Sequence, residues 1–202
     1  MKEIPRTVWV ISLAALLVRL LLLFSILPLG GVEALVMGDS RGFLRVAENI
    51  AAGNGISQSE YAPFLPDSRF PPVFPLLIAG SLAVFGSFLP VIFLNIVIAS
   101  LVPAVVFALG SRFTSRLKVL VAASALAAFE PLMIIFSVLL IPHPLSLVLL
   151  LFSCLFFVRL FETQTSGDAA FGGLFLGLSV LVRPHGKLLA GFAFFFFIVF
   201  AF

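Results

Sequence analysis

Long apolar stretches make up most of this chain and restrict it to a helical, membrane-embedded fold. The first stretch, Val8 to Leu27, carries a single charge, Arg19. A helix of about 20 residues crosses the hydrocarbon layer of a membrane, about 30 Å, because each residue rises about 1.5 Å. Further apolar stretches follow at about 71–86, 88–110, 118–140, 145–161, 169–183 and 188–202. The sequence therefore predicts an all-α, polytopic transmembrane helix bundle.

The composition excludes a soluble globular domain. Hydrophobic residues make up 62% of the chain and charged residues only 10%, whereas roughly 25% charged residues is usual in soluble domains. The net charge of +3 does not indicate nucleic-acid binding, because the cations of membrane proteins gather in cytoplasmic loops. The one cysteine, Cys154, lies inside an apolar stretch, so we expect a small buried hydrophobe and no disulfide.

The distribution of cations predicts which helix ends face the cytoplasm. Lys2 and Arg6 precede the first stretch, which is too long for a signal-peptide core and lacks an A-x-A site, so we expect a retained span that starts inside. Stretch 71–86 opens with three prolines in five positions and is short for a crossing. If it does not cross, the basic cluster at 112–118 is cytoplasmic, as the positive-inside rule requires; if it crosses, that cluster lies outside. We favour the first topology.

In the favoured topology, the polar segments able to support chemistry all face the extracytoplasmic side. They are a loop of about 29–87 after the first span, "IPHP" at 141–144 and "RPHGK" at 183–187. The chain then ends in "FAFFFFIVFAF", with no charge or loop after the last apolar stretch. We therefore expect residues 1–202 to be the N-terminal portion of a longer transmembrane domain whose C-terminal remainder is absent.

Residues 40–52, "SRGFLRVAENIAA", have the periodicity of an amphipathic helix. Phe43, Val46 and Ile50 fall on one side, and two glycines follow the end of the helix. This pattern predicts a helix in the membrane interface. Asp39 precedes its first turn and has two interpretations: an N-cap that accepts hydrogen bonds from amides of that turn, or a general base at the membrane surface.

Arg19 lies inside the first span, about 12 Å below its outer end. A charge at that depth costs a few kcal/mol and is a candidate functional residue by default. The structural alternatives are snorkelling toward the outer headgroups or pairing with Glu130, the acid within a later span.

Three stretches, in order, carry a family resemblance: "GDSRGFLRVAENIAAGNGIS", "RFPPVFPLLIAGSLAVFG" and "GLFLGLSVLVRPHGKLL". They contain an acidic residue just outside the first span, an "AxNxxxGxG" helix, a basic residue before "PP", and "RP" at a later exit. With these motifs the chain resembles, over nearly its whole length, the GT-C superfamily of membrane glycosyltransferases. Within that superfamily it looks most like the protein-mannosyltransferase and aminoarabinose-transferase branch. Relatives are typically longer, and many have a glutamate where "LLIPHPLS" has His143.

The resemblance implies transfer of a sugar, usually with inversion, from a polyprenyl-phosphate-linked donor to a lipid, glycan or protein acceptor. The active site would face outside, at the plasma (inner) membrane. Asp39 matches the catalytic aspartate of the family's first extracytoplasmic loop. The cations expected at the lipid phosphate are Arg69, Arg183, Arg19, Lys187 and His185, of which the last two could instead be interfacial anchors.

Four further polar residues are candidates for an acceptor site or are ordinary loop residues: Arg41, Glu60, Tyr61 and His143. No cluster of residues has metal-ligand spacing, and no glycine-rich nucleotide loop follows a strand, so we expect no metal and no cofactor.

The residue types suit the implied chemistry. A polyprenyl phosphate leaves only if its developing charge is stabilised, and arginine remains protonated and can bind phosphate bidentately. An acceptor hydroxyl or amine needs a base, and a positioned carboxylate contributes about 10²–10⁴-fold. Two other functions stay open. A transporter or flippase-like carrier of an anionic lipid would contain paired interrupted half-helices, and a non-catalytic truncated scaffold would tolerate the loss of Asp39.

Overall fold

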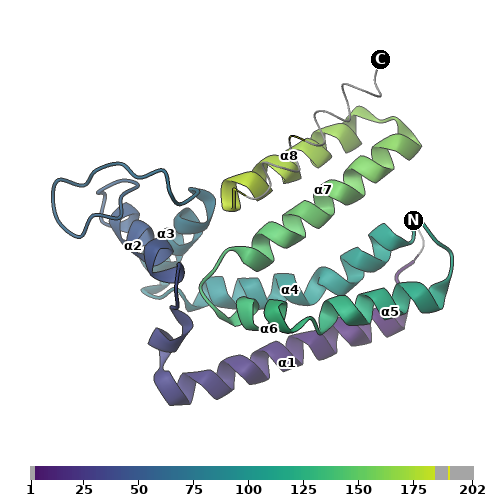
Figure 1. The fold of residues 1–202 in the computed structure, drawn as a ribbon, viewed down its shortest axis with the longest axis horizontal. Coiled ribbons are helices and arrows are strands. Elements are labelled where there is room, and N and C mark those ends of the chain that lie inside the picture. Colours follow the sequence, from purple (N-terminus) through teal and green to yellow (C-terminus); the bar gives the residue numbers. More distant parts are fainter. Residues whose placement is uncertain (1–2, 185–190, 192–202) are drawn as a thin grey trace.

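The computed structural model describes residues 3–184 and 191, and every regular element among these residues is helical (Figure 1). This confirms the all-α prediction. The elements and their bounds are α1 (Arg6–Gly30), the 3-10 turn η1 (Val32–Leu35), α2 (Ser40–Ala51), α3 (Val73–Phe85), α4 (Leu89–Gly110), α5 (Leu117–Ala128), α6 (Pro131–Val138), α7 (His143–Thr163) and α8 (Ser166–Val182).

The long helices run alongside one another, and α2 and α3 lie at one end of them (Figure 1). Helix α4 is the centre of the bundle, since it packs against α1, α5, α6 and α7 and is the most buried of the long helices. The C-terminus of α1, the start of α4 and the α6–α7 connection lie at the same end as α2 and α3 (Figure 1). Helix α8 reaches it too, because α8 contacts α3.

Among the described residues, α1, α4 and α7 are long and apolar enough to cross a membrane, and α5 with α6 forms a fourth candidate span if the bent pair counts as one. Helix α3 has only 13 residues, about 20 Å at about 1.5 Å per residue. That length is well below the roughly 30 Å of hydrocarbon, which supports the prediction that stretch 71–86 does not cross. The predicted span at 188–202 lies outside the described residues.

The predicted span at 118–140 consists of two helices, α5 and α6, which bend by 46° and together form one candidate span. Pro131 explains the break: it has no amide hydrogen to continue α5, and it disfavours helical geometry at Glu130. The Glu130 carboxylate then accepts hydrogen bonds from the amides of Leu132 and Met133 and caps α6. Glu130 therefore begins a helix, and its carboxylate interacts with Arg19 only through electrostatic attraction at more than 4.0 Å.

Helix α1 has one face for protein and one for lipid. Val8, Ala15 and Leu23 are fully buried against the bundle, whereas Leu13 and Leu21, on another face, are more than half exposed. An apolar exposed face is stable only when lipid covers it. The apolar face of the predicted amphipathic helix, α2, is buried against α3.

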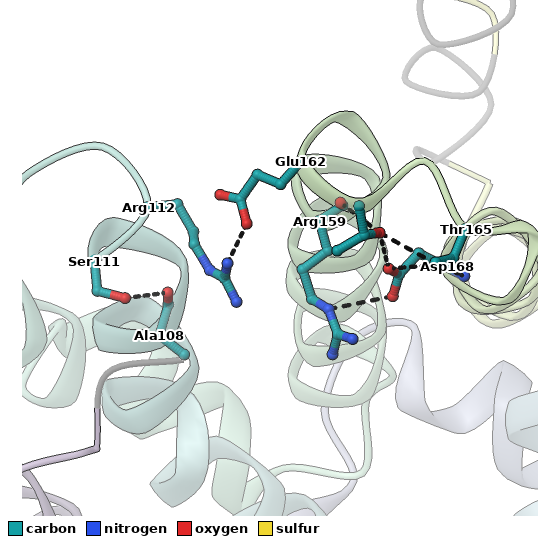
Figure 2. Close-up of polar contacts among 8 residues, drawn as sticks. Ala108, Ser111, Arg112, Arg159, Glu162, Thr165 and Asp168 are labelled. Carbon is teal, nitrogen blue, oxygen red and sulfur yellow. Dashed lines mark hydrogen bonds and ion pairs between the residues drawn. The ribbon is translucent and has the colours of Figure 1, made fainter.

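Ion pairs join α4, α7 and α8 at the end of the bundle opposite α2 and α3 (Figures 1 and 2). Arg112, just after α4, pairs with Glu162 near the end of α7. Arg159 pairs with Asp168 of α8, with 3.2 Å between Nε and Oδ1 (Figure 2). The N-terminal part of α1 packs at this same end, where Val8 contacts the end of α4 and the start of α5. The basic cluster at 112–118 thus shares a side with the N-terminus, which supports the favoured topology.

Candidate functional site

Asp39 precedes α2, but its carboxylate does not cap the helix. Its backbone is already helical, with φ −63° and ψ −18°, and the side chain accepts no capping hydrogen bond. The amides of Gly42 and Phe43 donate instead to the backbone carbonyl of Asp39, at 3.0 and 3.2 Å. The capping interpretation of this carboxylate therefore does not describe the structure, and the exposed side chain is available for another role.

The Asp39 side chain opens into a cavity of about 150 Å³ at the end of the bundle where α2 and α3 lie. Four segments that are distant in the sequence form its walls: α2, the turn before α3, the start of α7 and the residues after α8. The lining residues are Asp39, Phe43, Arg69, Phe70, Pro71, Ile141, Pro142, His143, Arg183 and Pro184. The cavity thus brings together Asp39, both family-matched arginines and His143.

Arg183 reaches this cavity because α8 ends just before it. Pro184 disfavours helical geometry at Arg183, whose backbone is extended, with φ −152° and ψ 129°. Its amide still closes the last turn by donating to the carbonyl of Ser179 at 2.9 Å. Burial lowers the pKa of Arg183 below its usual value, and the negative charge of Asp39 opposes this shift. The two predicted site residues are therefore electrostatic neighbours.

The α6–α7 wall of the cavity is attached to the central helix. Asn95 of α4 is buried, and its Nδ2 donates to the carbonyl of Ile141 at 2.9 Å. Pro142 and His143 then begin α7. The imidazole of His143 lies against Phe136 of α6, with 4.5 Å between ring centroids. His143 thus lines the cavity from a fixed turn.

The side chain of Arg69 is exposed, but its position is fixed by its backbone amide and by the neighbouring residue Phe70. Its amide donates to Oδ1 of Asp67 at 2.7 Å. Its guanidinium lies 5.6 Å from the centroid of the Phe70 ring, within the range of a cation–π contact. Phe70 in turn packs edge-on against Phe43 of α2, with 4.6 Å between ring centroids. Local sequence patterns do not predict this aromatic pair, because 26 residues separate Phe43 from Phe70 within the predicted outer loop.

The "AxNxxxGxG" motif has a structural explanation. The Nδ2 of Asn49 donates to the carbonyls of Ser57 and Ser59, at 2.7 and 3.0 Å. Between Asn49 and Ser57 the chain turns through Gly53 and Gly55, whose φ angles are 81° and 80°. Glycine adopts this left-handed region without the penalty of a Cβ atom. The motif therefore folds the loop back on the end of α2.

The other predicted site residues lie away from this cavity. Arg19 is fully buried in α1 and does not line it. Arg41 lines a separate cavity of about 290 Å³ with Glu33, Arg45 and Glu48. Positions 41, 45 and 48 occupy the side of α2 opposite Asp39 and Phe43.

Two loop candidates, Glu60 and Tyr61, are also outside the main cavity. Glu60 pairs with Arg45 at 2.9 Å, and Tyr61 is 80% exposed. His185 and Lys187 lie outside the described residues. Among residues 3–184 and 191, no group of three or more His, Cys, Asp or Glu side chains could hold a metal ion.

The chain is similar to a known protein family. A family model described as dolichyl-phosphate-mannose-protein mannosyltransferase matches residues 69–201. The matched segment begins at Arg69 and includes Arg183, the two cations of the cavity. No curated protein and no solved structure matches the chain.

Proposed function

The chain belongs to the dolichyl-phosphate-mannose-protein mannosyltransferase family, and on this basis we propose that it transfers a sugar from a polyprenyl-phosphate donor to an acceptor at the extracytoplasmic face of the membrane. One observation carries the proposal: Asp39, Arg69 and Arg183 line the same cavity. The cavity lies at the end of the bundle opposite the basic cluster at 112–118, and under the positive-inside rule this arrangement favours an extracytoplasmic site.

In the proposed reaction the acceptor oxygen or nitrogen attacks the anomeric carbon of the donor sugar. The bond between that carbon and the phosphate oxygen breaks, and the phosphate oxygen keeps the electron pair. Asp39 takes the proton from the acceptor, while Arg69 and Arg183 stabilise the charge on the departing polyprenyl phosphate. Attack on the face opposite the leaving phosphate inverts the configuration at the anomeric carbon.

The relative positions of these groups suit both tasks. A carboxylate that caps no helix can accept a proton without loss of a structural hydrogen bond, and Asp39 meets this condition. Arg183 is half-buried, and a fixed cation in a partly desolvated site stabilises developing phosphate charge more strongly than a solvated one. The cavity of about 150 Å³ is the proposed place of the reacting groups.

The transporter alternative has weaker support. It requires paired interrupted half-helices. Within the described residues a single bent pair is found, α5 with α6, and its break is explained by Pro131. The scaffold alternative does not explain why three charged residues line one cavity.

Replacement of Asp39 by asparagine in the intact enzyme tests the proposal. Asp39→Asn keeps the size of the side chain and removes the base, so sugar transfer from a polyprenyl-phosphate donor should fall by about 10²-fold or more. The thermal stability should stay unchanged, because the Asp39 carboxylate caps no amide. Glu33→Gln is the matched control, since Glu33 is an exposed acid of the same outer region that does not line the cavity. Wild-type turnover in Asp39→Asn would overturn the proposal.

A further inference from the structure

We propose that residues 53–72 form a clasp on α2, and that Asn49 and Asp67 are positioning residues that hold Arg69 at the cavity. The proposal rests on the proposed function in one respect, because it assumes that Arg69 binds the donor phosphate. It adds two residues that do not touch the donor and explains how an exposed loop presents a fixed cation.

The first attachment is made by Asn49. This side chain is 6% exposed, and its amide donates to the backbone carbonyls of Ser57 and Ser59. Its oxygen accepts a hydrogen bond from Asn54 at 3.3 Å. Buried carbonyls that lose such donors remain unsatisfied at a cost of about 1–3 kcal/mol. Asn49 therefore ties segment 54–59 to the last turn of α2.

The second attachment connects segment 54–59 to Arg69 through Asp67. The amide of Asp67 donates to the carbonyl of Ile56 at 2.9 Å, and its carboxylate accepts hydrogen bonds from the Gln58 side chain and the Arg69 amide. The hydrogen bond from the Arg69 amide, followed by that from Gln58, lowers the pKa of Asp67 below its usual range. The carboxylate is thus charged at neutral pH, the form that accepts these bonds most strongly.

A third contact fixes the residue on the other side of Arg69. The Phe70 ring packs on Phe43 and lies over Gly42 so closely that a Cβ at Gly42 would meet Cζ of Phe70 at 2.2 Å. The backbone on both sides of Arg69 is therefore fixed to α2, the helix that Asp39 precedes. An exposed arginine on a mobile loop would lose more side-chain and loop entropy on binding phosphate than one whose backbone is already placed.

A double-mutant cycle on the intact enzyme tests whether Asp67 acts through Arg69. Asp67→Ala should raise the donor KM by about tenfold, leave the acceptor KM unchanged, and add nothing once Arg69→Ala is present. Ser68→Ala is the matched control, because Ser68 is exposed and lies between the two residues. Additive effects of Asp67→Ala and Arg69→Ala would show a general structural role for Asp67 and overturn the positioning proposal.

A second measurement does not depend on activity. Arg69 is the one Lys or Arg between Arg45 and Arg112, so trypsin added to purified protein in nanodiscs can cut this segment only after Arg69. Asn49→Asp removes the donors and keeps the acceptor, and it should open the clasp and increase the rate of this cleavage at least about fivefold. Equal rates in wild type and Asn49→Asp would overturn the clasp. Faster cleavage together with no sugar transfer by any variant, wild type included, would leave the clasp supported and reject the proposed function alone.

Discussion

The Nη1 of Arg19 donates a hydrogen bond of 3.1 Å to the carbonyl of Ala128, the last residue of α5. The last carbonyls of a helix have no partner within the helix, and at the α5–α6 break no water is expected if this segment lies in the membrane. Arg19 is fully buried and also donates to the carbonyl of Ala15 at 3.0 Å. This contact gives the intramembrane cation a structural role at the break, and snorkelling is inconsistent with its burial.

Arg19→Met should therefore destabilise the enzyme and leave donor binding intact. Methionine fills much of the same space but leaves the Ala128 carbonyl without its donor, at a cost of about 1–3 kcal/mol. We expect a lower Tm in a lipid nanodisc, an unchanged donor KM in the folded fraction, and partial recovery of stability in Arg19→Lys. A raised donor KM at unchanged Tm would instead place Arg19 at the lipid phosphate.

The topology can be tested by labelling single cysteines in a Cys154→Ser background. Tyr61 lies in the expected outer loop and is 80% exposed, and Ser115, also exposed, lies between α4 and α5. An impermeant maleimide added to intact cells should label Tyr61→Cys but not Ser115→Cys, and permeabilisation should expose the second site. Labelling of both positions in intact cells would mean that α3 crosses the membrane despite its length, and labelling of Ser115→Cys alone would mean that the whole topology is inverted.

Local sequence patterns predicted most of the helices. The long apolar runs gave α1, α4 and α7 to within a few residues, and the amphipathic period gave α2. The break at Glu130 had a local signal too, an acidic residue before a proline, but the uninterrupted apolar run around it favoured one long helix. A run of apolar residues indicates burial but not the direction of the helix axis. The bend between α5 and α6 was therefore not predicted.

The cavity itself was not predictable from local patterns. Arg69 and Arg183 were identified through family motifs, Asp39 was also a candidate from its position before a predicted helix, and nothing in their spacing places the three together. Their meeting depends on α8 ending beside α3 and on the loop folding back onto α2. The capping interpretation of Asp39 was reasonable from its position before a helix, and only the backbone and side-chain geometry of Asp39 removes it.

Gly42→Ala should lower both stability and donor affinity. Alanine in a helix interior is normally more favourable than glycine by about 0.5–1 kcal/mol, but a Cβ here would overlap the Phe70 ring. Overpacking of this kind costs about 1–3 kcal/mol, and a displaced Phe70 would move Arg69. Gly80→Ala in α3 is the control, since a Cβ there meets no atom within 4 Å. A higher Tm in Gly42→Ala, with unchanged donor KM, would contradict the packing argument.

The clasp should be insensitive to pH across the neutral range. The pKa of Asp67 is lowered, chiefly by the Arg69 amide and then by Gln58, so the stabilisation is complete above the unfolded value of about 3.9 and is lost as the pH falls through the lower folded value. Hydrogen exchange of residues 53–72, corrected for the intrinsic rate, should show constant protection from about pH 8 to 5 and a loss below about pH 4. Asp67→Asn should abolish this transition, and Glu60→Gln should retain it. A loss of protection near pH 6 in wild type would point to a different group.

Arg183→Lys distinguishes a phosphate ligand from a membrane anchor. The extended backbone before Pro184 places this side chain at the cavity beside Asp39. An anchor needs only a long cation, so lysine would replace arginine without loss. A bidentate phosphate site would not tolerate the exchange, because lysine offers a point charge in place of a planar fork. We expect normal folding and a donor KM raised about tenfold, roughly 1.4 kcal/mol, whereas Arg41→Lys, on the other side of α2, should behave as wild type. Superimposable donor curves for wild type and Arg183→Lys would leave Arg183 as an anchor and remove it from the proposed leaving-group site.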